Sequence, residues 1–132
     1  MKGDATGAPA PGATPCAVVA VTSGEPAGVG PDICLALARH TFPARLVILC
    51  DRALLEERRQ RLRLEVVVAD FDPGRRSAPG TLEVLHLPLA QTCRAGVLDP
   101  ANGPYVLSLL ERAADGCMSG EFAAMVTAPV HK

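Results

Sequence analysis

The residues best suited to chemistry lie in one glycine-rich stretch, residues 22–32, with the sequence TSGEPAGVGPD. An apolar run precedes this stretch and helix-forming residues follow it, so the sequence predicts a turn from a strand into a helix. Glycine in such a turn can take positive φ or let another group approach the backbone closely. Pro31 and Asp32 suit the first turn of the helix, where a missing N–H costs nothing and a carboxylate complements the helix dipole.

A glycine-rich turn before a helix is typical of phosphate binding, but this stretch matches neither of the two common phosphate motifs. Ile33 stands where the G-x-G-x-x-G fingerprint needs its third glycine, and no Gly-Lys-Ser/Thr follows. The carboxylates of Glu25 and Asp32 would also repel a pyrophosphate at close range. The residues alone leave two interpretations open, a cofactor or substrate loop of another type and a plain tight turn.

Lys132 is the one basic group expected beside a cleft, because it closely follows the predicted strand that ends at Thr127. It could hold a substrate phosphate or carboxylate, or it could be a solvated loop lysine. The three histidines (His40, His86 and His131) lie on separate predicted elements, so the sequence suggests no metal site. It also contains no G-x-S-x-G nucleophile motif.

Composition argues against several classes of function. A net charge of −1 gives no electrostatic case for binding nucleic acid or an anionic membrane, and the scarcity of aromatic residues argues against base stacking. No apolar span has the length needed to cross a bilayer. The five cysteines match no zinc spacing and predict reduced thiols in a cytoplasmic protein. Residues 1–15 predict a disordered leader and not a signal peptide.

The elements that must position the glycine turn alternate along the chain. Strands are expected at residues 17–21, 45–50, 64–69, 81–87 and 123–127, with helices after Pro31, over residues 52–61, and from Asp99 or Gly103 to a stop at Gly116. This order predicts an α/β fold with a largely parallel sheet and helices on both faces. Ligands of such sheets bind beyond the carboxyl ends of the strands, so the glycine turn and residues 127–132 could face one cleft.

Three further residue patterns favour structural roles. Asp51 follows the second strand and is predicted to cap the next helix, although an acid at this place could instead hold a ribose. The charged run over residues 56–63 is predicted to be a solvated helix face with i,i+4 ion pairs. His86 shares a strand face with Leu82 and Val84, which predicts an ordinary half-buried histidine.

Taken whole, the glycine stretch resembles the signature of the 4-hydroxythreonine-4-phosphate dehydrogenase family of pyridoxal phosphate synthesis. Two further segments carry the same resemblance: NGPYV at residues 102–106 and GEFAAMVTAPVHK at residues 120–132. The resemblance covers roughly residues 17–132. It implies a relative of isocitrate and isopropylmalate dehydrogenases, with two α/β domains, a cleft between them and a homodimer that completes each site.

The resemblance also implies a reaction. Family members oxidise the hydroxyl of 4-phosphohydroxy-L-threonine with NAD or NADP, and the β-keto acid that results loses CO₂ to leave an aminoketone phosphate. A divalent metal (Zn, Mg or Co), held by three histidines, polarises the alcohol while the nicotinamide takes the hydride. The residues of this chain that carry over are lining residues of the cofactor or substrate cleft: Gly24, Glu25, Pro26, Gly28, Gly30, Asp32, Thr127, Pro129 and Lys132.

No catalytic or metal-binding residue carries over, because in the family those residues follow the Thr-Ala-Pro-x-x-Lys segment. Residues 16–132 are therefore expected to be a truncated N-terminal α/β domain that binds no catalytic metal and is inactive alone. Two alternatives stay open. One is a dehydrogenase of a related phosphorylated four-carbon sugar acid (D-threonate or D-erythronate phosphate). The other is a non-catalytic α/β module that binds a nucleotide or a partner protein.

Overall fold

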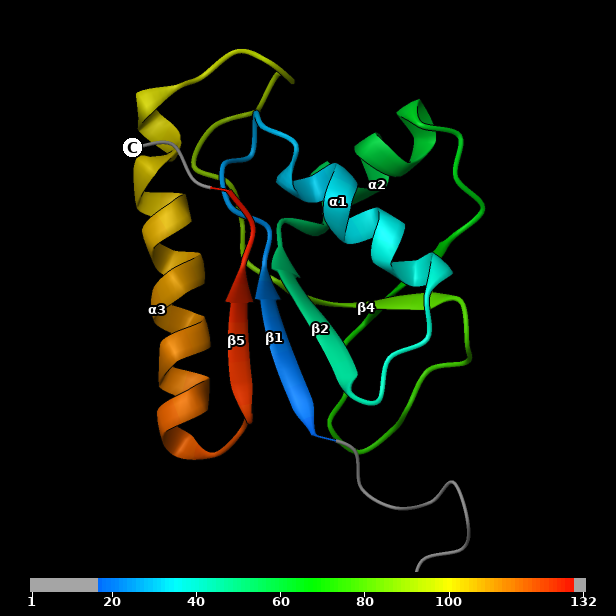
Figure 1. Cartoon of the computed structure of the whole chain (residues 1–132). Coiled ribbons are helices and arrows are strands. Elements are labelled where there is room, and N and C mark those ends of the chain that lie inside the picture. Colours follow the sequence, from blue (N-terminus) through cyan, green and yellow to red (C-terminus); the bar gives the residue numbers. More distant parts are fainter. Residues whose placement is uncertain (1–16, 130–132) are drawn as a thin grey trace, which may run out of the picture.

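The computed structural model describes residues 17–129, and within them five strands form one parallel sheet. The spatial order is β3-β4-β2-β1-β5, so β1 lies inside the sheet while β3 and β5 form its edges (Figure 1). The strands span Val18–Thr22, Arg45–Cys50, Val67–Asp70, Thr81–His86 and Ala124–Thr127, in sequence order. All four pairings are parallel, which confirms the predicted sheet. The predicted leader, residues 1–15, lies outside the described residues.

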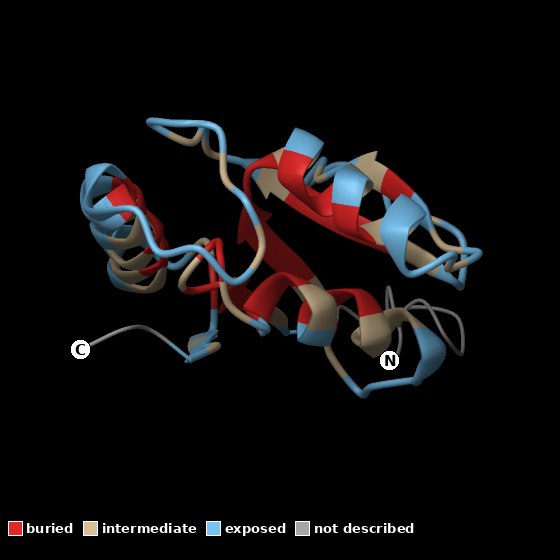
Figure 2. Ribbon diagram, turned by 90° about the horizontal axis from the view of Figure 1, so that it is seen from above, coloured by how far each residue is buried: buried red, intermediate tan, exposed pale blue. Residues whose placement is uncertain are grey.

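Helices cover both faces of the sheet, as predicted. The two helices α1 (Gly30–Ala36) and α2 (Arg52–Arg61) pack on one face, and α3 (Gly103–Ser119) packs on the other (Figures 1 and 2). Short 3₁₀ turns follow α1 and precede α3, at Leu37–Arg39 and Pro100–Asn102. None of the helices within residues 17–129 combines the length and apolar character that a membrane crossing needs.

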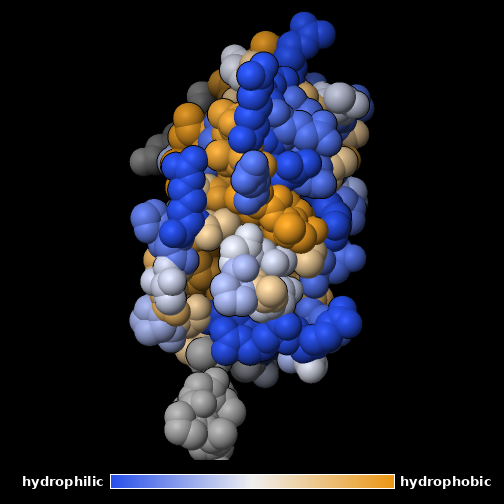
Figure 3. All heavy atoms as spheres, turned by 90° about the vertical axis from the view of Figure 1, so that its right-hand side faces the viewer, coloured by the Kyte–Doolittle hydropathy of each residue, from blue (hydrophilic) through white to orange (hydrophobic). Residues whose placement is uncertain are grey.

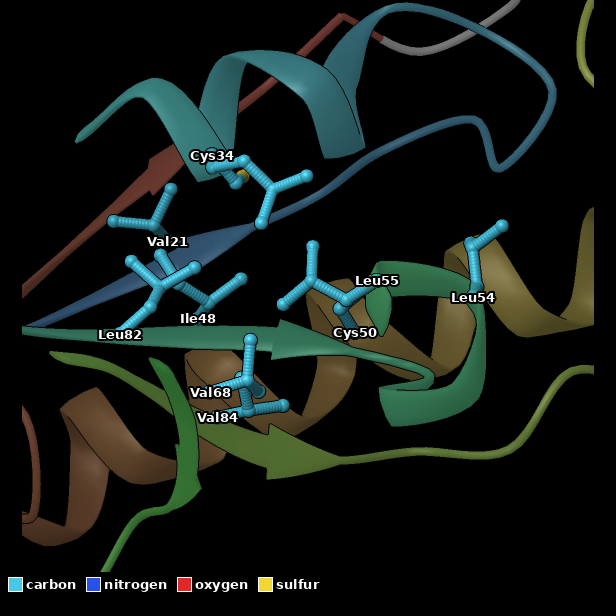
Figure 4. Packing of buried hydrophobic residues seen from close by; sticks show 10 residues of the cluster. Val21, Cys34, Ile48, Cys50, Leu54, Leu55, Val68, Leu82 and Val84 are labelled. Atoms are coloured by element: carbon cyan, nitrogen blue, oxygen red, sulfur yellow. The ribbon is translucent and has the colours of Figure 1, made fainter. Parts of the chain in front are cut away.

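The inner strands β1, β2 and β4 alternate their side chains between two apolar cores, as the period-two geometry of a strand requires. Val21 and Ile48 face α1 and α2, where they pack with Leu35, Leu55 and their neighbours (Figure 4). Their neighbours in sequence, Ala20, Val47 and Leu49, face α3 instead. The inner strands β1 and β2 are therefore buried on both faces, which explains their nearly continuous apolar sequences, whereas the edge strands β3 and β5 are largely exposed.

Helix α3 does not end at Gly116 as predicted; it continues to Ser119. Gly120, with φ 87° and ψ 2°, supplies the left-handed residue that ends the helix. Gly116 is buried because Phe122 packs on it: a Cβ at position 116 would lie 2.3 Å from the Phe122 ring. A glycine that makes room for a neighbouring ring looks, in sequence, like a helix stop.

The third strand is shorter than predicted and begins at Val67. Helix α2 ends at Arg61, and Arg63 takes a left-handed backbone conformation with φ 55°. The N–H of Leu64 then donates to the carbonyl of Arg59, so residues 62–64 close the helix and do not start the strand. Figure 3 shows the face that lies on the right-hand side of Figure 1. This face is mainly hydrophilic, with an apolar area near its centre.

Candidate functional site

The glycine turn lies at the carboxyl end of β1 and pairs with the segment that follows β5. The Glu25 N–H donates to the carbonyl of Pro129 at 3.2 Å, and the Ala128 N–H donates to the carbonyl of Thr22 at 2.9 Å. Thr127 is in register with Thr22 across the two strands. The two predicted site segments therefore lie side by side, while predicted site residue Lys132 lies outside the described residues.

Two of the three glycines in the turn are required by close backbone contacts. Gly24 has φ +73°, and a Cβ there would lie 2.3 Å from the Pro129 carbonyl oxygen. A Cβ on Gly30 would lie 1.8 Å from the carbonyl oxygen of Ser23. Gly28 meets no contact shorter than 3.4 Å, so its position is open to a side chain. The turn is thus folded tightly on itself and on the end of β5.

The predicted lining residues do not open onto a single groove. Glu25, half-buried, borders a groove of about 510 Å³ whose apolar wall comes from Leu98, Val106 and Leu107. Thr127 and Pro129 border a different groove, of about 390 Å³, between α1 and β5. Gly24, Pro26 and Gly30 are buried, and one carboxylate oxygen of the half-buried Asp32 accepts a hydrogen bond from Arg58. The shared cleft expected from the sequence is not formed by residues 17–129 alone.

Arg58 is the main residue of this region whose surroundings differ from the prediction. It lies in the charged run predicted to be solvated, yet it is only 2% exposed. Its guanidinium donates to the carbonyls of Pro26 and Gly28, at 2.6 and 3.0 Å, and to the carboxylate of Asp32 at 3.0 Å. The prediction is wrong for Arg58, although Arg59 and Arg61 do pair with Glu56 and Glu57 on the same helix. A signal was available, since Arg58 follows the buried Leu54 and Leu55 at helical spacing.

A second loop covers the glycine turn. The Gly96 N–H donates to the carbonyl of Ala27 at 2.8 Å, which ties the loop after β4 to the turn. Cys93 in this loop lies near Arg58, and partial burial raises the pKa of its thiol. The described cysteines 34, 50, 93 and 117 are all free thiols, as predicted.

Asp51 caps α2, which confirms the predicted structural role. One carboxylate oxygen accepts from the Leu54 N–H at 3.1 Å, and the other accepts from the Leu89 N–H at 2.8 Å. The backbone N–H of Asp51 donates to the hydroxyl of Tyr105, and burial raises the pKa of that hydroxyl. Because both oxygens are occupied and Asp51 is buried, the alternative role as a ribose ligand has no support.

His86 is exposed, so the prediction of a half-buried histidine is wrong. Its Nδ1 accepts from the Arg52 N–H at 3.0 Å, at the start of α2. Position 86 is the last residue of β4, where the sheet no longer covers the side chain. Among residues 17–129 no three His, Cys, Asp or Glu side chains lie close enough together to hold a metal ion.

Comparison with known proteins gives consistent matches. Residues 42–132 match the family described as "Pyridoxal phosphate biosynthetic protein PdxA". The chain is 57% identical over 115 residues to the 4-hydroxythreonine-4-phosphate dehydrogenase of Chromobacterium violaceum, covering 87% of this chain and 35% of the relative. It is 52% identical over 117 residues to the protein of the same name from Vibrio cholerae, covering 86% and 36%. The chain thus spans about a third of the length of these relatives.

Solved structures show the same fold. The 4-hydroxythreonine-4-phosphate dehydrogenase of Burkholderia phymatum superposes with a TM-score of 0.80 at 25% identity, over 89% of this chain and 37% of that one. The protein of the same name from Klebsiella pneumoniae gives a TM-score of 0.77 at 29% identity, over 88% and 38%. The five-stranded parallel sheet with its helices therefore matches part of a larger architecture.

Proposed function

The chain belongs to the PdxA family of pyridoxal phosphate biosynthetic proteins, and we propose that it is part of a 4-hydroxythreonine-4-phosphate dehydrogenase. The reaction would be the oxidation of 4-phosphohydroxy-L-threonine by NAD or NADP, followed by loss of CO₂ to give an aminoketone phosphate. The observation that carries this proposal is the 57% identity, over 115 residues or 87% of this chain, to a relative of that name. The proposed setting is a cytoplasmic homodimer with the two-domain architecture of isocitrate and isopropylmalate dehydrogenases.

The described residues fit the wall of an active site better than its reacting centre. No metal cluster exists within residues 17–129, so no catalytic step is assigned through a metal here. The glycine turn also lacks a dinucleotide fingerprint, because Ile33 replaces the third glycine and α1 is only seven residues long. Cofactor, metal and substrate phosphate would be held mainly by sequence that the relatives carry outside the matched third.

Two surface features support a role as one part of a larger active site. The groove beside the edge strand β5 is lined by apolar side chains, and Val126 and Ile33 are 54% and 46% exposed there. Such a patch is typical of a surface that another part of a protein covers. The glycine turn and the end of β5 meet at the carboxyl edge of the sheet, where ligands of parallel sheets bind. The lining roles of Gly24, Glu25, Pro26, Gly28, Gly30, Asp32, Thr127, Pro129 and Lys132 remain proposals.

The proposed activity can be tested by following reduced nicotinamide formation. The purified chain and a version that includes any downstream reading frame would be given 4-phosphohydroxy-L-threonine, a divalent metal, and NAD or NADP. We expect activity only in the extended protein, and loss of that activity on chelation of the metal. Faster turnover of D-threonate or D-erythronate phosphate would favour the related sugar-acid dehydrogenase. Activity in the 132-residue chain would contradict the proposal that the reacting groups lie outside these residues.

A further inference from the structure

One buried arginine of α2, Arg58, contacts the glycine turn. Arg58 lies in the second half of α2 and is 2% exposed, while the turn it contacts lies about thirty residues earlier in the sequence. Removing a guanidinium from water is costly unless its donors find acceptors. Its Nη1 donates to both the Gly28 carbonyl and the Asp32 carboxylate, and its Nη2 donates to the Pro26 carbonyl. Both terminal nitrogens therefore point at one seven-residue segment.

These contacts fix the direction of three consecutive carbonyl groups. Arg58 holds the carbonyls of Pro26 and Gly28, and the carbonyl between them, on Ala27, accepts the Gly96 N–H of the covering loop. The carbonyls of Pro26 and Gly28 bind Arg58 of α2, whereas the Ala27 carbonyl binds the covering loop. The turn and the covering loop thus depend on one arrangement of the backbone at residues 26–28.

We infer that Arg58 is a positioning residue that sets the shape of the glycine turn and, through Ala27, the place of the loop that covers it. The planar guanidinium suits this task because it offers several donors in a fixed fork, whereas a lysine ammonium is a compact point charge. It also balances the charge of Asp32, the acid at the start of α1. This role concerns how the turn is built and does not depend on the proposed dehydrogenase activity.

Amide hydrogen exchange, measured residue by residue on the 132-residue chain, tests this role. Two amides report on the turn: Gly28 N–H, bonded to the Glu25 carbonyl, and Gly96 N–H, bonded to the Ala27 carbonyl. The amides of β2 serve as an internal reference, because β2 lies inside the sheet. In Arg58→Met we expect both reporters to exchange at least about tenfold faster, with the β2 amides changed by less than about twofold.

Two matched variants separate the effect of the Arg58 guanidinium from the effect of a positive charge alone and from the effect of losing any arginine of α2. Arg61→Met removes an exposed arginine of the same helix that pairs with Glu57, and we expect it to leave both reporters unchanged. Arg58→Lys retains a positive charge but not the fork, so we expect exchange rates between those of the parent chain and of Arg58→Met. Full restoration of the parent rates by lysine would overturn the inference.

A different variant covers the case in which Arg58→Met fails to fold. Asp32→Asn removes the ion pair and leaves both carbonyl contacts of Arg58 in place. We expect about threefold faster exchange at Gly28, with unchanged exchange in β2. Unchanged exchange at Gly28, or an equal rise at Gly28 and throughout β2, would overturn the inference. Either result would leave the proposed enzymatic activity standing, because that proposal is tested separately by turnover.

Discussion

Gly30 and Ser23 approach each other so closely that a Cβ on Gly30 would lie 1.8 Å from the Ser23 carbonyl oxygen. The contact joins the first residue of α1 to the residue that directly follows β1. The Ser23 N–H donates to the Leu49 carbonyl at 3.1 Å, so Ser23 is anchored to the neighbouring strand and cannot move aside freely. The tight turn from strand to helix therefore depends on the missing side chain at position 30.

Gly30→Ala should destabilise the chain by roughly 2 kcal/mol or more, because the added methyl group meets fixed backbone and not a flexible side chain. Urea unfolding followed by circular dichroism measures this change in the free energy of unfolding. Gly103→Ala is the matched control, since Gly103 also begins a helix but has no neighbour within 4 Å of its Cβ position. We expect that control to be neutral or stabilising by up to about 1 kcal/mol. Equal stability of Gly30→Ala and the parent chain would show that the turn can relax.

The contact between Gly116 and Phe122 gives a second prediction. Gly116→Ala places a methyl group 2.3 Å from the ring of a fully buried phenylalanine, so it should lower the free energy of unfolding by about 1–3 kcal/mol. Phe122→Leu removes part of the ring and should cost about 1 kcal/mol alone. In the double variant the smaller side chain makes room for the methyl group, so the total cost should fall below the sum of the single costs by at least about 0.5 kcal/mol. Additive costs in urea unfolding would contradict this packing.

Several features of the fold could be predicted from the sequence because they depend on local pattern. The apolar runs mark all five strands, and Asp51 marks the start of α2 through its capping side chain. Features that depend on distant contacts could not be predicted in the same way. Nothing local shows that Phe122 packs on Gly116, or that the buried face of α2, which includes Arg58, meets the glycine turn. The local pattern therefore predicts the glycine turn itself, whereas it places the residue that holds the turn, Arg58, at the surface.

The buried ion pair between Arg45 and Glu83 gives a third prediction. Both side chains are less than a tenth exposed, and two guanidinium nitrogens of Arg45 contact the two carboxylate oxygens of Glu83. The same guanidinium donates to the carbonyls of Asp72 and Arg75 in the loop after β3. The hydrogen bond with Glu83 is the main reason why the pKa of Arg45 lies above its ordinary value.

Arg45→Met should therefore cost about 3–5 kcal/mol of unfolding free energy, because Glu83 would remain buried without a partner. The double variant Arg45→Met with Glu83→Leu removes both charges and should be more stable than Arg45→Met by at least about 1 kcal/mol. Arg59→Met serves as the control, since that arginine forms a more exposed pair with Glu56 and should cost less than about 1 kcal/mol. If the double variant were less stable than Arg45→Met, the unpaired carboxylate of Glu83 would not be the cause of the destabilisation in Arg45→Met.

Buried thiol and phenol groups make the stability of the chain sensitive to alkaline pH. Burial raises the pKa of Cys34 to about 12 and also raises the pKa values of Cys50 and Tyr105. In the unfolded chain these groups ionise near their ordinary values, about 8.5 for cysteine and about 10 for tyrosine. Above those values the unfolded state has lost protons that the folded state still holds, so rising pH favours unfolding.

The free energy of unfolding should therefore be fully retained below about pH 8 and should fall as the pH rises, by up to about 1.4 kcal/mol per pH unit for each group that ionises only on unfolding. Urea unfolding at a series of pH values measures this slope. Cys34→Ala removes one of the thiols, so its curve should be flatter than that of the parent chain between about pH 9 and 10. Because the chain contains a single tyrosine, tyrosinate absorbance reports on Tyr105 alone. This absorbance should appear together with unfolding; if it appeared in the folded chain near pH 10, Tyr105 would not be held in its protonated form by burial.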